Sequence, residues 1–194
     1  MRSRVPNALS WLRIGLSVCL VPAALADRRD LFWVLLLASL ASDALDGFLA
    51  RLLHVTSDLG RRLDSWGDYA LLLTLIPSLV LLWPELMRRE AAWFIVALAA
   101  YFAPTAWSFV RWRTIPGFHT RASKAMAVGM GVSLPIMLLG GPPEPLRVLC
   151  ALQVLVAVEE FGILHLMPRF SGSMPGYWHA RRRHEILALR EQAD

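Results

Sequence analysis

The sequence predicts an all-α membrane protein, a bundle of six transmembrane helices. The first observation is composition: 56% of the 194 residues are hydrophobic and only 18% are charged. A soluble domain usually has about 45–50% apolar and about 25% charged residues. The second observation is distribution, because the apolar residues are spread along the chain rather than gathered in one anchor. Both observations are typical of a protein that crosses the membrane several times.

Six stretches approach the length of roughly 17–25 mostly apolar residues that a membrane-spanning helix needs. In order they are about Ala8–Ala26, Leu31–Ala50, Leu63–Trp83, Ala91–Val110, Ala125–Leu139 and Leu146–Met167. The short polar breaks that separate them include Asp27–Asp30, Pro84–Glu90, Arg111–Lys124 and Gly141–Pro145. The fifth stretch is short and rich in glycine, which membrane helices tolerate because neighbouring helices satisfy the backbone.

The two ends of the chain need separate interpretations. The first apolar stretch also resembles a signal peptide, because Ala24-Leu25-Ala26 fits a cleavage pattern. Arg13 interrupts the apolar core that such a peptide requires, so we expect a retained first helix. We expect residues 1–170 to form one six-helix membrane domain. Residues 171–194 are polar and basic with a weak helical pattern, and we expect a cytoplasmic tail or an interfacial helix.

The positive charge predicts the orientation and excludes one function class. With six spans, 15 of the 20 Lys and Arg residues lie on the side of the two termini. The positive-inside rule therefore places both termini in the cytoplasm. The net charge is +5, but no basic run is interleaved with aromatic residues in a soluble segment. We therefore expect membrane lipids as partners and no nucleic acid.

Four aspartates lie near the cytoplasmic ends of the second and third predicted spans: Asp43, Asp46, Asp64 and Asp68. A spacing of three or four residues places each pair on one helix face. Charged residues at membrane depth are costly and mark a functional site by default. Four facing carboxylates need cations between them, and oxygen ligands suit Mg²⁺, Mn²⁺ or Ca²⁺. In the alternative interpretation the aspartates only cap helices and pair with neighbouring arginines, Arg51, Arg61 and Arg62.

These aspartates belong to a longer pattern of 26 residues, D-x2-D-G-x2-A-R-x8-G-x3-D-x3-D. Its eight fixed positions are Asp43, Asp46, Gly47, Ala50, Arg51, Gly60, Asp64 and Asp68. Near the N-terminus, Pro6-Asn7-Ala8-Leu9-Ser10 is followed by Arg13. The pattern resembles the signature of the CDP-alcohol phosphatidyltransferase family, and the N-terminal segment resembles the family's opening.

The resemblance implies a six-helix membrane enzyme, commonly a homodimer. Its donor would be a CDP-linked lipid, typically CDP-diacylglycerol, and its products a phospholipid and CMP. The four aspartates would hold two divalent cations, Mg²⁺ or Mn²⁺, and Asp68 would also be the general base. The residues expected at the CDP-lipid are Asn7, Ser10, Gly47, Ala50, Arg51 and Gly60. We expect a bacterial inner-membrane protein with its active site facing the cytoplasm.

The alcohol acceptor is predicted from basic residues near one cytoplasmic break, Arg111, Arg113, Arg121 and Lys124. Arg and Lys bind phosphates, so glycerol 3-phosphate or another phosphorylated polyol is one expectation. Ordinary positive-inside charge, or attraction to anionic lipid, is the other interpretation. Glu159 and Glu160 are intramembrane acids that could bind the acceptor or a basic residue. Adjacent helical residues diverge by about 100°, and the sequence does not choose between the two.

Two other function classes could use similar residues. A Mg²⁺-dependent membrane prenyltransferase also handles a pyrophosphate, but it usually carries two well-separated acidic motifs. A non-enzymatic cation-binding membrane protein, such as a transporter, would carry polar residues through most of the bilayer. In this chain all four aspartates lie within 26 residues and on the predicted cytoplasmic side. All four are intact, so nothing in the sequence indicates an inactive family member.

Overall fold

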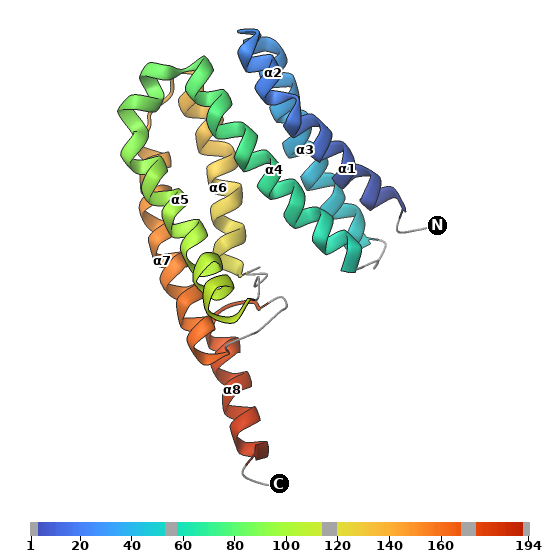
Figure 1. Ribbon diagram of the computed structural model, residues 1–194, viewed down its shortest axis with the longest axis vertical. Coiled ribbons are helices and arrows are strands. Elements are labelled where there is room, and N and C mark those ends of the chain that lie inside the picture. The colour runs from blue at the N-terminus through green and yellow to red at the C-terminus, as the bar shows by residue number, and fades with distance from the viewer. Residues whose placement is uncertain (1–3, 53–57, 114–119, 168–173, 192–194) are drawn as a thin grey trace. The chain divides into compact units, whose positions relative to one another are not determined.

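The computed structural model describes residues 4–52, 58–113, 120–167 and 174–191, and every regular element in these ranges is an α-helix (Figure 1). The helices are α1 (Arg4–Val18), α2 (Leu20–Leu25), α3 (Arg29–Leu52), α4 (Asp58–Leu82), α5 (Pro84–Trp112), α6 (Arg121–Leu138), α7 (Glu144–Leu166) and α8 (Tyr177–Glu191). The predicted all-α class is therefore confirmed.

The predicted apolar stretches correspond to helices in order, with two differences. The segment Pro84–Glu90 was expected to be a break, but it forms the first two turns of α5. Proline suits the first position of a helix because its missing N–H would have no helical partner there. The negative charge of Glu85 in the first turn also stabilises the helix, because it interacts favourably with the positive end of the helix dipole.

The first predicted stretch contains a break between α1 and α2, at Cys19. Pro22 lies four residues after Val18, and a proline ring collides with the carbonyl four positions before it. The bonds around the break remain helical, since Cys19 N–H donates to Gly15 O and Ala23 N–H donates to Cys19 O. The stretch therefore keeps helical bonding and is interrupted at Cys19, three residues before its proline.

Three helical stretches in the described part of the chain are long and apolar enough to cross a membrane. They are Ala8–Leu25, Pro84–Trp112 and Glu144–Leu166, and Trp66–Leu82 is a shorter apolar helix. Many large apolar side chains on these helices are exposed, among them Trp11, Ile95 and Leu155. Apolar exposure along whole helices is expected where lipid rather than water covers the surface.

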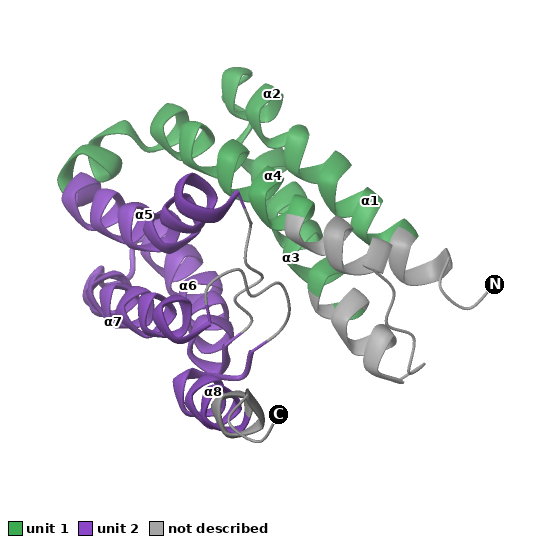
Figure 2. Cartoon of the chain, turned by 60° about the horizontal axis from the view of Figure 1, so that its bottom comes forward, with its two compact units in different colours: residues 1–89 green, residues 90–194 purple. Residues whose placement is uncertain are grey.

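The chain divides into two compact units, residues 1–89 and residues 90–194 (Figure 2). In the first unit α1 packs along both α3 and α4, and α2 also contacts both. Arg29 joins the start of α3 to the end of α4, because its Nη2 donates to Leu82 O at 2.8 Å. The Arg29 guanidinium also lies 5.3 Å from the ring centre of Trp83. The first unit therefore brings the two aspartate-bearing helices against α1.

In the second unit α6 packs against α7, and α7 packs against α8. Arg147 on α7 donates two hydrogen bonds of 2.8 Å to the carboxylate of Glu90 on α5. The start of α8 is attached to the end of α7 through a small apolar cluster of Ile163, Met174 and Ala180. The stretch expected as a tail therefore contains a helix that is docked at its first turns.

Candidate active site

A buried polar face runs along α1. Ser10, Arg13 and Ser17 recur at helical spacing on this face, and each is at most 2% exposed. Polar side chains inside a membrane bundle are costly unless they bond across helices. The face of α1 therefore marks where α3 and α4 must supply polar partners.

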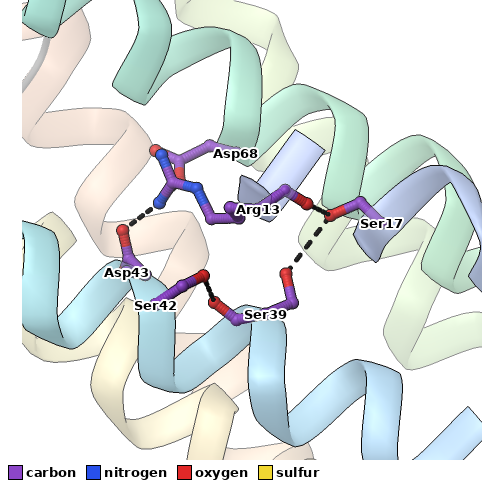
Figure 3. A network of polar contacts seen from close by, with 6 residues as sticks. All are labelled: Arg13, Ser17, Ser39, Ser42, Asp43 and Asp68. Carbon is purple, nitrogen blue, oxygen red and sulfur yellow. Dashed lines mark hydrogen bonds and ion pairs between the residues drawn. The ribbon is translucent and has the colours of Figure 1, made fainter. Parts of the chain in front are cut away.

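The Arg13 network consists of Arg13, Ser17, Ser39, Ser42, Asp43 and Asp68 (Figure 3). Its centre is the Arg13 guanidinium, which forms an ion pair with Asp43 of α3. The same Nη1 atom lies 3.4 Å from Oδ1 of Asp68 on α4. One cationic group from α1 therefore joins the first and the last aspartate of the 26-residue pattern.

The position of the guanidinium depends on Gly67, the residue before Asp68. A Cβ atom on Gly67 would lie 2.5 Å from Nη2 of Arg13, which is closer than van der Waals contact allows. Glycine at this point of α4 therefore leaves the space that the guanidinium fills.

Serine hydroxyls fix the helices around Arg13. Ser17 Oγ donates to the carbonyl of Arg13 at 2.8 Å, and it lies 3.2 Å from Ser39 Oγ on α3. Ser42 Oγ donates to Ser39 O at 2.8 Å. Small hydroxyl residues allow close helix approach and bond across the interface. The Ser17–Ser39 contact joins α1 to α3 near Asp43, whereas the other two bonds each lie within one helix.

The two carboxylates differ from the arginine in exposure. Arg13 is 1% exposed, whereas Asp43 and Asp68 are 50% and 49% exposed. The carboxylate oxygens can therefore be reached from outside while the guanidinium cannot. Carboxylate oxygens are the ligands that Mg²⁺ and Mn²⁺ prefer. Asp43 and Asp68 could therefore each supply an oxygen to a divalent cation.

The other two aspartates lie on the same helices, Asp46 on α3 and Asp64 on α4. Their side chains are outside the described residues, so the four-carboxylate cage stays a prediction. Among the side chains that are described, no three His, Cys, Asp or Glu residues gather at one point.

The residues predicted to bind the CDP-lipid lie on α1, α3 and α4. Ser10 is buried on the same face of α1 as Arg13. The side chains of the remaining five are outside the described residues, namely Asn7, Gly47, Ala50, Arg51 and Gly60. The structure thus places Ser10 beside the aspartate helices and leaves the roles of all six as predictions.

The basic acceptor candidates belong to the second unit, and all four are exposed: Arg111, Arg113, Arg121 and Lys124. Arg111 lines a groove of about 650 Å³ together with Trp107, Trp112, Phe161, Leu164 and His165. Arg113 follows α5 with a left-handed φ of 56°, which is uncommon for a residue other than glycine.

Glu159 and Glu160 have different structural partners. Glu159 Oε1 accepts the backbone N–H of Tyr177 at 3.1 Å, so this carboxylate caps the start of α8. Glu160 is buried and accepts a hydrogen bond of 2.8 Å from Ser123 Oγ on α6. Ser123 also bonds to Thr120, the N-cap of α6. The two acids therefore fix the ends of α6, α7 and α8, a use that the sequence did not indicate.

Arg13 is the site residue that sequence reasoning did not select. The sequence analysis names it as a charge that interrupts an apolar stretch and as part of the N-terminal segment that resembles the family's opening, but assigns it no role. The signal that could have found it is the polar face of α1, where Ser10 and Ser17 lie three residues before it and four residues after it. A lone arginine on such a face needs an acid from a neighbouring helix.

A family model for CDP-alcohol phosphatidyltransferases matches residues 3–162. The chain belongs to this family. The match covers all of the helices that carry Arg13, Asp43 and Asp68, and it ends before α8. No curated protein and no solved structure matches the chain.

Membership confirms the resemblance and sets the reaction class. The family transfers a substituted phosphate group from a CDP-alcohol in phospholipid synthesis, and it is generally dependent on divalent cations. The apolar helices and the family together indicate a membrane protein.

Proposed function

We propose that this CDP-alcohol phosphatidyltransferase transfers the phosphatidyl group of CDP-diacylglycerol, or a related CDP-lipid, to an alcohol and releases CMP. The observation that supports this best is the convergence of Asp43 and Asp68 on one cationic group, from two helices. Both carboxylates belong to the family's signature and both are half exposed. The exposure of the two carboxylates leaves them accessible to a substrate or a metal ion.

The chemistry assigned to the chain follows from these carboxylates. Asp68 accepts the proton of the acceptor hydroxyl, because a free alcohol is a poor nucleophile at neutral pH. The hydroxyl oxygen forms a bond to the β-phosphorus of the donor. The bond from that phosphorus to the bridging oxygen breaks, and CMP leaves with the electron pair. The half-exposed position of Asp68 allows a substrate hydroxyl to approach it.

The metal site is assigned to Asp43, Asp46, Asp64 and Asp68, which would hold two Mg²⁺ or Mn²⁺ ions. When bound, the ions would neutralise the pyrophosphate and stabilise the leaving CMP. The donor headgroup would contact Asn7, Ser10, Gly47, Ala50, Arg51 and Gly60. Of these, the burial of Ser10 beside Arg13 supports a place near the carboxylates.

The proposed acceptor is a phosphorylated polyol such as glycerol 3-phosphate. Its phosphate would be bound by Arg111, Arg113, Arg121 and Lys124, whose exposure leaves them accessible to a charged ligand. Arg121 and Lys124 lie in the first turn of α6, where the positive end of the helix dipole also favours an anion.

The proposed setting is a six-span homodimer in a bacterial inner membrane, with both termini and the active site on the cytoplasmic side. The Lys and Arg distribution supports this orientation. Membership of the family favours this reaction over that of a membrane prenyltransferase or of a cation transporter.

The test is a release assay with the purified full-length chain in lipid nanodiscs. CDP-diacylglycerol with a labelled cytidine is supplied with Mg²⁺ or Mn²⁺ and a panel of alcohols, phosphorylated and not. We expect CMP release that requires one acceptor, stops in EDTA and returns when the cation is restored. Release with no acceptor in the panel and no binding of the CDP-lipid would contradict the proposal.

A further inference from the structure

We propose that Arg13 is a built-in counter-ion of the aspartate site, which holds Asp43 and Asp68 together and competes with divalent cations for their carboxylates. The inference rests on the proposed function, because it assumes that these carboxylates bind metal ions. Arg13 would then be a positioning residue rather than a group that touches the reacting atoms.

The first argument is the geometry of the three side chains. Asp43 and Asp68 come from α3 and α4, which pack on α1 more than on each other. Arg13 of α1 contacts both carboxylates through the same nitrogen, Nη1. Two carboxylates near one point repel each other, and a cation between them removes that repulsion. The contact therefore fixes the relative positions of the two aspartate-bearing helices.

The second argument is that several features of the structure fix the position of the Arg13 side chain. The side chain is 1% exposed, so its charge is shielded from water and must be balanced by the protein. Gly67 supplies the space that the guanidinium occupies. Ser17 fixes the backbone of Arg13 and reaches Ser39 on α3. An arginine that only extended towards lipid headgroups would need none of these features.

The consequence is a competition of charges. A divalent cation that binds Asp43 and Asp68 meets the positive charge of Arg13 beside the same oxygens. At partly buried sites a unit charge a few ångströms away changes an ion's affinity by about tenfold or more. Arg13 should therefore stabilise the metal-free protein and weaken metal binding, so that cations bind reversibly rather than permanently.

The experiment compares Arg13→Met with Arg147→Met in the full-length chain. Arg147 is a matched control, because it also joins two helices by an ion pair to a carboxylate, that of Glu90. The thermal midpoint of each protein is measured in EDTA and in saturating MgCl₂. Calorimetric titration with MgCl₂ alone, without any CDP-lipid, gives the affinity for the ion.

We expect Arg13→Met to lose stability mainly in EDTA and to gain more from Mg²⁺ than the wild type does, since tighter binding stabilises more. Its Mg²⁺ affinity should rise about tenfold. Arg147→Met should lose the same amount in both solutions and bind Mg²⁺ as the wild type does.

Equal losses in EDTA and Mg²⁺ for Arg13→Met, with unchanged Mg²⁺ affinity, would overturn the counter-ion role while leaving the proposed function intact. A wild type that binds no Mg²⁺ and gains no stability from it would overturn both. If Arg13→Met does not fold, Arg13→Lys provides the test. A lysine keeps the charge but not the planar guanidinium, so its Mg²⁺ affinity should stay close to that of the wild type. A tenfold rise in Mg²⁺ affinity for Arg13→Lys would contradict the competition of charges.

Discussion

The two units each contain an arginine that joins two helices through carboxylates, and the burial of the partners is reversed. In the first unit Arg13 is 1% exposed and its partners Asp43 and Asp68 are about half exposed. In the second unit Arg147 is 34% exposed and its partner Glu90 is 1% exposed. The first arrangement leaves the carboxylates accessible, and the second encloses the carboxylate.

The two arginines also differ in how they bond to their carboxylate partners. Arg147 holds both oxygens of Glu90 with two hydrogen bonds of 2.8 Å, the fork geometry that gives a strong and specific pair. Arg13 instead divides one nitrogen between two acids, and its contact with Asp68 is 3.4 Å long. Glu90 is therefore fully used for structure. Asp43 and Asp68 are about half exposed, so a ligand can approach them from outside.

The largest expected effect is on catalytic activity, which should depend on the half-exposed carboxylate of Asp68 and not on the buried carboxylate of Glu90. Asp68→Asn should lower the rate of CMP release by about a thousandfold, because general-base catalysis contributes about 10²–10⁴. Much of the CDP-lipid binding should remain, because the other three predicted metal ligands and the predicted headgroup residues are unchanged. In the same assay Glu90→Gln should keep the wild-type rate per folded molecule. A normal rate for Asp68→Asn would exclude Asp68 as the base.

The next largest expected effect is on thermal stability, which should depend on the ion pair between Arg147 and Glu90. Arg147→Met leaves the buried carboxylate of Glu90 without its main partner, which costs about 3 kcal/mol. For a chain of this size that cost lowers the thermal midpoint by about 6–12 °C. Melting curves followed by circular dichroism measure the shift, and activity below the midpoint should be unchanged. A shift under about 2 °C would show that the pair is not needed for the fold of the second unit.

A smaller effect is expected at Gly67. Gly67→Ala places a methyl group against the Arg13 guanidinium, and such overpacking costs about 1–3 kcal/mol. Gly15→Ala is the matched control on α1, because a Cβ there meets nothing within 4 Å. That variant should be neutral or slightly stabilised. Equal melting curves for the two variants would mean that Gly67 makes no room for Arg13.

The smallest effect concerns the start of α8. Glu159→Gln weakens the cap on the Tyr177 N–H, and loss of a cap costs about 1 kcal/mol. Hydrogen exchange of the first turn of α8 should become faster, while CMP release stays normal. Glu185→Gln, which changes only an exposed pair with Arg181, is the control. Unchanged exchange in Glu159→Gln would remove Glu159 from the attachment of α8.

Much of the fold could be predicted, because a long run of apolar residues in the sequence indicates a membrane-spanning helix. All of the predicted stretches are helical, and the family was found from eight fixed positions. The break at Cys19 was not predicted, although the Pro22 ring, which collides with the carbonyl of Val18, explains it. The charged segment Pro84–Glu90 predicts a break between helices. In the structure it is the start of α5, because a helix can extend beyond its apolar part.

The site was harder to predict in its contacts. Spacing alone placed Asp43 and Asp68 on facing helices, but it could not reveal a partner 30 and 55 residues away. The choice between Glu159 and Glu160 likewise depends on how α6 and α8 pack on α7. Which face of a helix meets a neighbour is set by tertiary packing, and the sequence of one helix does not contain that information.

The central claim is that the half-exposed carboxylates in the first unit bind metal ions while the buried carboxylate in the second does not. Manganese binding, followed by electron paramagnetic resonance on the full-length chain, tests it most directly. We predict saturable binding of about two Mn²⁺ per chain, lost in Asp43→Asn and retained in Glu90→Gln. Wild-type binding in the Asp43→Asn variant would contradict the claim.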